Sequence, residues 1–194
     1  KNLQEAHNDN FTVPAFADGY WVMFDYNRGY ADDIEASGIA SIYRQPKFSY
    51  YFFQSQRNAD EQAPQFESGP MVYIASNWVE TSSTNVRVFS NAERVALYLN
   101  DRLIATQSPN TDALSTHLAH PPFTFSIDKF EPGTLRAEAL IGENVVARHS
   151  VTTPEQATAL TLRLDTSGIA PTPYVKDKVF VYAQMVDAKG NPVR

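Results

Sequence analysis

Seven short segments between residues 68 and 154 alternate apolar and polar side chains, and this pattern restricts the fold more than any other feature of the chain. The segments are MVYIAS (71–76), NVRVFS (85–90), RVALYL (94–99), RLIATQ (102–107), FTFSI (123–127), TLRAEALI (134–141) and VVARHSVT (145–152). A period of two is typical of strands that bury one face, as Val95, Leu97 and Leu99 would in the third segment. Such strands need a covering layer, so the pattern predicts packed sheets.

Closely spaced turn residues separate these segments. Asn100 and Asp101 tolerate positive φ, which favours a two-residue hairpin between the third and fourth segments. Gly142-Glu143-Asn144 turns the last pair. We therefore predict a mainly β fold class with an immunoglobulin-like β-sandwich over residues 68–154.

The first 57 residues have an α/β character. KNLQEAHN (1–8) can form the end of a helix. Residues 19–25 form a continuous apolar run, which is typical of a buried strand in a parallel sheet. A single strand cannot satisfy its own edges, so this part predicts one β/α unit of a larger sheet or barrel.

An aromatic helix is expected after this strand. Pro46 suits the first helical position, and Phe48, Tyr51 and Phe52 would form one stripe on a helix of about three turns. Either another chain supplies the missing strands, or this stripe docks on the sandwich. We expect it to dock.

The remaining segments predict a linker and an incomplete last domain. Residues 58–67 are polar, with a proline, and indicate a linker. Residues 155–194 contain an alternating strand with Leu160, Leu162 and Leu164, followed by a second apolar segment and a turn. Two or three strands are too few for an independent sandwich, so we expect a truncated β-domain here and cut points at both ends of the chain.

Composition excludes several classes of protein. The 194 residues include no cysteine, so disulfides and thiol catalysis are excluded. The net charge of −6 and the absence of a Lys/Arg cluster argue against nucleic acid as a partner. No apolar run approaches the roughly 20 residues that cross a bilayer, so no membrane partner is expected. The lack of cysteine fits a periplasmic, surface or secreted bacterial protein.

No pair of catalytic carboxylates stands out. Asp32, Asp33 and Glu35 are expected in a solvated acidic loop, and Glu138 at a solvent-facing strand position. No phosphate-binding loop, nucleophile elbow or histidine-based triad is present.

His117 and His120 have a spacing that could hold a metal on a helix. The following Pro121-Pro122 argues for a loop instead, so we expect no metal site and no cofactor.

The polar cluster after the apolar run is the exception. Trp21 precedes this cluster, and Asp25, Tyr26 and Asn27 fall where the strand leaves its sheet. In barrels and open α/β sheets, substrates meet the protein at this end of the strands. An indole face suits the C–H face of a sugar, while Asp25 and Asn27 suit its hydroxyls. A plain core role for Trp21 remains the alternative.

At this stretch the sequence resembles glycoside hydrolase family 2, closest to bacterial β-galactosidases, near the end of the catalytic (β/α)8 barrel. The W-x-x-F-D-Y pattern is matched by Trp21, Phe24, Asp25 and Tyr26, and the following R-x-P-K helix with paired aromatics by Arg44, Pro46, Lys47, Tyr50 and Tyr51. Four later segments resemble the immunoglobulin-like domain that follows the barrel, namely GPMVYIASNW, VRVFSNAERVALYLNDRLIA, HPPFTF and PGTLRAEALIGENVVARHSV. Residues 155–194 resemble the start of a further invasin-like β-domain.

The resemblance implies a carbohydrate-active parent. The family hydrolyses terminal β-linked sugars by a retaining mechanism with two glutamates about 5–5.5 Å apart. Both lie on earlier barrel strands in the family, and no glutamate here occupies such a motif, Glu5 included. The resemblance therefore implies no catalytic residue in this chain, no activity of the chain alone, and the rest of the barrel as a partner. Trp21 matches a tryptophan that forms a wall of the subsite for the non-reducing-end sugar.

A non-catalytic function is the alternative hypothesis. The sandwich could act as a structural spacer or a weak carbohydrate-binding module, with Trp78 and Tyr98 as the candidate exposed aromatics. For each of these two residues, a core or interdomain position is the competing interpretation.

Overall fold

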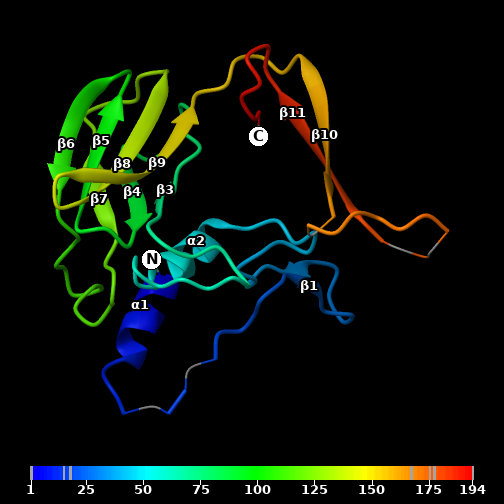
Figure 1. Cartoon of the computed structure of the whole chain (residues 1–194), viewed down its shortest axis with the longest axis horizontal. Helices are drawn as coiled ribbons and strands as arrows, with labels where there is room; N and C mark the ends of the chain where they lie inside the picture. The colour runs from blue at the N-terminus through cyan, green and yellow to red at the C-terminus, as the bar shows by residue number, and fades with distance from the viewer. Residues whose placement is uncertain are drawn as a thin grey trace. The chain divides into compact units, whose positions relative to one another are not determined.

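A computed structural model describes residues 2–14, 16–17, 19–166, 168–174, 176 and 178–193. The chain forms two compact units, Lys1–Val151 and Thr152–Arg194 (Figure 1). The boundaries expected at residues 57, 67 and 154 stay predictions.

Two antiparallel sheets make up most of the first unit. One has three strands in the order β3-β4-β7, with β3 at Val72–Ile74, β4 at Asn85–Ser90 and β7 at Phe123–Ser126. The other has four strands in the order β6-β5-β8-β9, with β5 at Arg94–Leu99, β6 at Arg102–Gln107, β8 at Thr134–Ile141 and β9 at Asn144–Thr152. The mainly β class and the seven predicted strands are confirmed (Figure 1).

The core lies between the inner faces of these sheets, as the alternation predicts. Val95, Leu97 and Leu99 of β5 are fully buried and pack in one cluster with Phe123 and Phe125 of β7. Burying a side chain of this size contributes about 1.5–3 kcal/mol. The inner faces therefore hold the sandwich together.

The predicted hairpin turn between β5 and β6 is confirmed. Asn100 and Asp101 have φ of 50° and 60°, which is the left-handed pair that such a turn needs. The Asn100 side chain also accepts a hydrogen bond from the Thr134 backbone N–H at 2.9 Å, which ties the turn to the start of β8.

The N-terminal part contains α1 at Asn2–Asn10 and α2 at Phe48–Ser55, with a small antiparallel pair of β1 at Tyr26–Asn27 and β2 at Ile34–Glu35. The helix was expected to begin at Pro46 and to run for about three turns, but α2 has eight residues, or roughly two turns. Lys47 has an extended backbone and is the N-cap, while Pro46 pairs with Ala40, so the helix cannot begin earlier.

Docking of α2 on the sandwich is confirmed. Phe52 is buried and meets Phe89 of β4 edge to face at 5.7 Å, and Tyr51 stacks on Tyr73 of β3. The Gln56 side chain adds a hydrogen bond to the His120 carbonyl at 2.8 Å. The predicted aromatic stripe is thus the docking face.

Helix α1 adds polar contacts to the sandwich. Gln4 is buried, donates to the Leu114 carbonyl at 2.9 Å and accepts from Arg87 of β4 at 2.7 Å. Asn8 is also buried and accepts a hydrogen bond from the His117 backbone N–H. Both helices are therefore fixed to the sandwich.

The second unit contains one hairpin, of β10 at Ala159–Asp165 and β11 at Phe180–Val186. Leu160 faces Met185 and Leu164 faces Val181 across it, and these four side chains are exposed. Among the described residues, no helix is long and apolar enough to span a membrane.

Candidate functional site

Trp21 lies on an open edge of the first unit. Its side chain is 69% exposed, and its Nε1 donates a hydrogen bond to the Tyr26 hydroxyl at 3.2 Å. The two rings are nearly perpendicular, with centroids 6.0 Å apart. The peptide bond between Trp21 and Val22 is cis. One polar contact therefore orients an indole that is mostly exposed to solvent.

The apolar run expected as a buried strand is not buried here. Met23 is 61% exposed, and residues 22–25 pair in parallel with residues 39–40 through the bonds Ile39 N–Val22 O, Ala40 N–Met23 O and Asp25 N–Ala40 O. No second strand pairs with this run among the described residues, so its other edge stays unpaired, and Val22 and Phe24 are only half-buried. The expectation of burial is wrong for this chain because it depends on neighbouring strands.

Asp25 anchors the end of this run. The residue is 8% exposed, and its Oδ1 accepts hydrogen bonds from Lys47 Nζ at 2.6 Å and from the Gly38 N–H at 2.9 Å. A Cβ at position 38 would lie 2.3 Å from the Asp25 nitrogen, so only glycine allows this approach. Asp25 thus joins the run, the 36–38 loop and the start of α2.

Asn27 is exposed and pairs with Ile34 in the β1–β2 ladder. Successive side chains of a strand point to opposite faces, so Asn27 points away from the face where Tyr26 meets Trp21. The structure brings Trp21 together with Tyr26, and Asp25 together with Lys47. The assignment of Trp21, Asp25 and Asn27 to substrate stays a prediction.

The acidic loop is only partly solvated. Asp33 has a side chain that is 73% exposed, as expected. Glu35, in contrast, accepts hydrogen bonds from Ser37 and Arg28, and these partners lower the pKa of its carboxyl. The expectation of a solvated side chain is therefore wrong for Glu35, because the β1–β2 pairing brings Arg28 to it.

Glu138 is also shielded, although a solvent-facing position was expected. Its side chain is only 13% exposed and accepts hydrogen bonds from Arg136 and from Arg148 Nε, the latter at 2.9 Å. Arg136 of β8 and Arg148 of β9 cover the carboxylate, so Glu138 has a structural role.

The two histidines lie in an irregular segment, as the prolines indicated. His117 donates its backbone N–H to Asn8, whereas the His120 Nε2 lies 3.1 Å from Asn58 Oδ1. In the described part of the chain, no group of three or more His, Asp or Glu has the arrangement of a metal site.

The two aromatic candidates of the sandwich are not exposed. Trp78 is fully buried and donates Nε1 to the Glu131 carbonyl at 3.0 Å. The Tyr98 ring lies under the Arg136 guanidinium at 4.2 Å. The core interpretation of Trp78 is confirmed.

Comparison with known proteins relates the chain to a domain family and to glycosidases. Residues 81–147 match a family described as a domain of unknown function, DUF4982. A β-galactosidase of Thermoanaerobacter pseudethanolicus is 35% identical over 148 residues, which cover 68% of this chain and 19% of the relative. A putative β-glucuronidase of Formosa agariphila is 25% identical over 226 residues, which cover 98% of this chain and 20% of the relative.

The solved structures show the same fold. A β-glycosidase from Bacteroides vulgatus superposes with a TM-score of 0.67 over 89% of this chain and 20% of that protein, at 17% identity. The chain belongs to glycoside hydrolase family 2, in its C-terminal portion. It spans about a fifth of the length of these family 2 relatives.

Two contacts of the predicted site residues were missed by reasoning from the sequence. Tyr26 was expected in the polar cluster at the end of the run, but its contact with the Trp21 indole nitrogen was not expected. Lys47 was quoted as part of R-x-P-K, and its pairing with Asp25 is 22 positions distant. The patterns themselves were the only available signal for both.

Proposed function

We propose that this chain is the C-terminal part of a retaining exo-β-glycosidase that hydrolyses terminal β-linked sugars, with a preference for β-galactosides. In this proposal, Trp21 forms one wall of the pocket for the non-reducing-end sugar. The observation that supports it best is an indole that is 69% exposed yet oriented by Tyr26, at the start of the run that pairs in parallel with residues 39–40.

The catalytic acids would come from the rest of the barrel. A retaining enzyme needs two carboxyl groups about 5–5.5 Å apart, one of them free to act as a nucleophile. Two carboxylates that follow Trp21 in the chain, Asp25 and Glu35, are each engaged by a cation and by another donor. We therefore expect no turnover by this chain alone.

The cations near Trp21 support a neutral sugar. A glucuronide would require a free cation for its carboxylate. Arg28 is paired with Glu35, Lys47 with Asp25, and the Arg44 guanidinium lies over the Phe24 ring at 3.9 Å. Each is already engaged, which favours galactose over glucuronic acid as the proposed sugar.

The sandwich would hold this part of the pocket in place. Helix α2 follows Lys47, the partner of Asp25, and docks through Tyr51 and Phe52. The contacts of Gln4 and Asn8 fix α1 in the same way. We propose that the sandwich acts as the support for the barrel edge that carries Trp21.

The test is kinetic and uses the full parent protein. Trp21→Ala should lower kcat/KM for a chromogenic β-galactoside by about tenfold or more, or about 1.4 kcal/mol of transition-state stabilisation. Tyr30→Ala, which removes an 84% exposed aromatic ring from the same segment, is the matched control and should change little. Equal losses in both variants, or a preference for the β-glucuronide, would overturn the proposal.

A further inference from the structure

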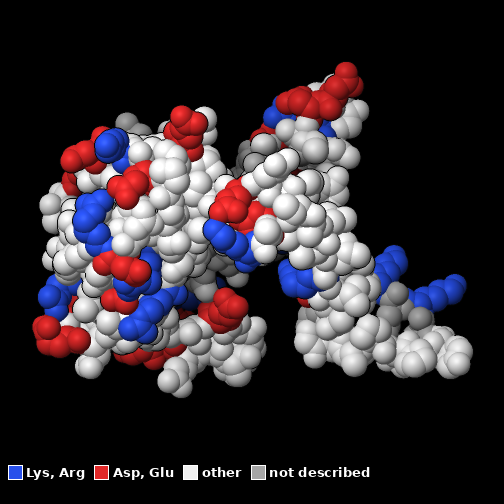
Figure 2. Space-filling model, turned by 90° about the horizontal axis from the view of Figure 1, so that it is seen from above, with Lys and Arg blue, Asp and Glu red and all other residues white. Residues whose placement is uncertain are grey.

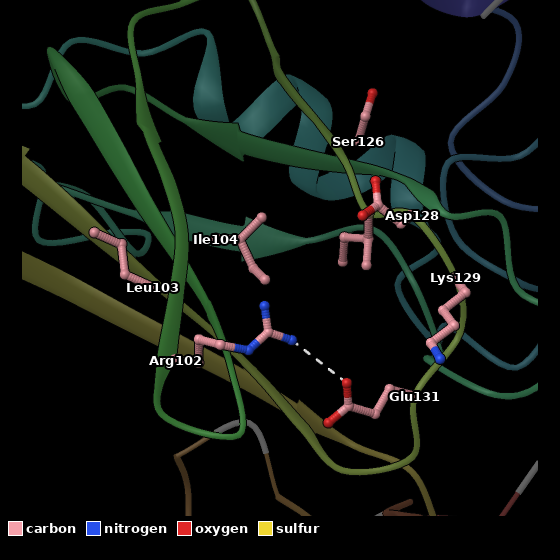
Figure 3. Close-up of a pocket in the computed structure, with 8 residues that line it drawn as sticks. Arg102, Leu103, Ile104, Ser126, Asp128, Lys129 and Glu131 are labelled. Atoms are coloured by element: carbon pink, nitrogen blue, oxygen red, sulfur yellow. Dashed lines mark hydrogen bonds and ion pairs between the residues drawn. The ribbon is translucent and has the colours of Figure 1, made fainter.

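A cavity of about 290 Å³ lies at the open edge of the sandwich, far along the chain from Trp21. Arg102, Leu103 and Ile104 of the edge strand β6 form one wall, and the other is formed by Ser126 with residues 127–129 and Glu131 after β7 (Figure 3). We call this space the edge cavity. Its volume is near the lower end of the ~300–1,000 Å³ typical of small-molecule sites, so it has room for one small ligand.

The wall after β7 is fixed to the core at both ends. The Ile127 N–H bonds to the Thr84 carbonyl at 2.9 Å, and the Glu131 carbonyl accepts the hydrogen bond from the buried Trp78. The Phe130 ring also packs against Trp78, with centroids 5.2 Å apart. Because this wall is already fixed, it loses little conformational entropy when a ligand binds. This favours the binding of even a small ligand.

Donors and acceptors of both charges surround the edge cavity. Arg102 reaches toward Glu131 and pairs with it at 3.4 Å, while Asp128 and Lys129 lie on the opposite wall (Figure 3). Within the described part of the chain, neither the Asp128 carboxylate nor Lys129 Nζ has a hydrogen-bond or ion-pair partner. Two positive and two negative groups cancel, so the site carries no net charge that would select an anion or a cation.

The wider surface gives the same picture. On the face of the first unit seen in Figure 2, acidic and basic side chains are intermingled rather than gathered by sign. This face therefore offers no patch of a single sign to a charged macromolecule.

We propose that the edge cavity binds a single neutral sugar residue, as a second carbohydrate site separate from Trp21. Sugar hydroxyls both donate and accept hydrogen bonds, so they can use the free Lys129 amine and Asp128 carboxylate together. Ile104 and Ile127 supply an aliphatic surface for the C–H groups of the ring. Because no aromatic side chain lines the cavity, the affinity is weak, with a Kd in the millimolar range. This proposal does not depend on the activity of the parent enzyme.

The test is an NMR titration of the ¹⁵N-labelled 194-residue chain with methyl β-galactoside and, separately, methyl β-glucuronide. The neutral glycoside should shift the amide signals of residues 102–104 and 126–131. Arg102→Ala and Lys129→Ala should each weaken this binding by about tenfold, because each removes a charged donor from the cavity. Both replaced side chains are exposed, and an unchanged spectrum elsewhere would confirm folding.

Arg148→Ala is the matched control. Arg148 lies on β9, the other edge strand of the same sheet, and also pairs with a glutamate, and its side chain is 62% exposed, as is that of Arg102. This variant should bind the glycoside normally. Three results would overturn the proposal: amide shifts confined to residues 19–30, shifts with the glucuronide alone, or binding by Arg102→Ala as tight as by the unmodified chain. The first of these results would still be compatible with a sugar site at Trp21.

Discussion

The Tyr51 ring of α2 stacks on the Tyr73 ring of β3, with centroids 3.5 Å apart and planes inclined by only 7°. The His149 ring of β9 lies 4.5 Å from Tyr73. A helix that belongs to a barrel pattern and two strands of a sandwich thus meet in one group of rings. This contact links the edge that carries Trp21 to the sandwich core.

Removing the stacked ring should therefore weaken the first unit. Tyr51→Ala is expected to lower the free energy of unfolding by about 2 kcal/mol, because a stacked pair adds about 0.5–1.5 kcal/mol to the lost buried area. Urea denaturation measures the change. Tyr43→Ala, which removes a 70% exposed ring, should stay within about 0.5 kcal/mol. Similar losses in the two variants would contradict the role given to the stack.

Acid should destabilise the fold through His149. Burial lowers the pKa of its imidazole below the usual value of 6.5, and its Nδ1 accepts the Ile74 N–H at 3.1 Å, which only an unprotonated nitrogen can do. The unfolded chain binds a proton near pH 6.5 and the folded chain does not. The contribution of His149 to the free energy of unfolding is therefore complete above about pH 6.5. It is lost as the pH falls below that value, by at most about 1.4 kcal/mol per pH unit.

The measurement is a set of urea titrations between about pH 7 and pH 5. His149→Gln should flatten the pH dependence, but not abolish it, because burial also lowers the pKa of His120. His117→Gln, which replaces an imidazole at an exposed loop position, is the matched control variant. A slope that is the same with and without His149 would show that the acid sensitivity arises elsewhere.

The sandwich could be predicted from the sequence because its signals are local. The four segments predicted at 85–90, 94–99, 102–107 and 134–141 coincide with β4, β5, β6 and β8. Alternation defines each strand and turn residues end it, and neither depends on distant parts of the chain.

The site was harder to predict because it depends on distant partners. The apolar run at 19–25 has the composition of a buried strand, but burial requires neighbouring strands, and Met23 is exposed without them. The Asp25–Lys47 pair forms only when the end of this run meets the start of α2. The shielding of Glu138 likewise needs arginines from two strands in register. Periodicity carries no information on such contacts.

The Asp25–Lys47 pair should contribute measurably to stability. Lys47→Met would leave a mostly buried carboxylate without its cation, and we expect a loss of about 1–2 kcal/mol, less than for a fully buried pair because the Lys47 side chain is 32% exposed. Lys129→Met removes an exposed lysine without a described partner and should have almost no effect. If both variants unfold at the same urea concentration, Asp25 is not an anchor.

Gly133 should be the least replaceable glycine of the sandwich. Its φ is +143°, and an added Cβ would lie 1.8 Å from Asn100 Oδ1, the atom that binds the Thr134 N–H. Gly133→Ala is therefore expected to cost about 3 kcal/mol from backbone strain and overpacking together. Gly142→Ala, at a φ of +57° with open space around it, should cost only about 1 kcal/mol. Equal thermal midpoints would show that the β5–β6 turn can move aside.

The two tryptophans should report separately on the open edge and on the core. Trp21 is 69% exposed and Trp78 is fully buried, so acrylamide should quench the emission of the folded chain in two distinct fractions. Trp21→Phe should remove the accessible fraction and leave a blue-shifted emission that quenches only after unfolding in urea. Phe16→Leu, which alters another fully exposed ring, should leave both fractions as they were. If Trp21→Phe keeps the accessible fraction instead, the indole is covered in solution, and a pocket wall at this edge is excluded for the isolated chain.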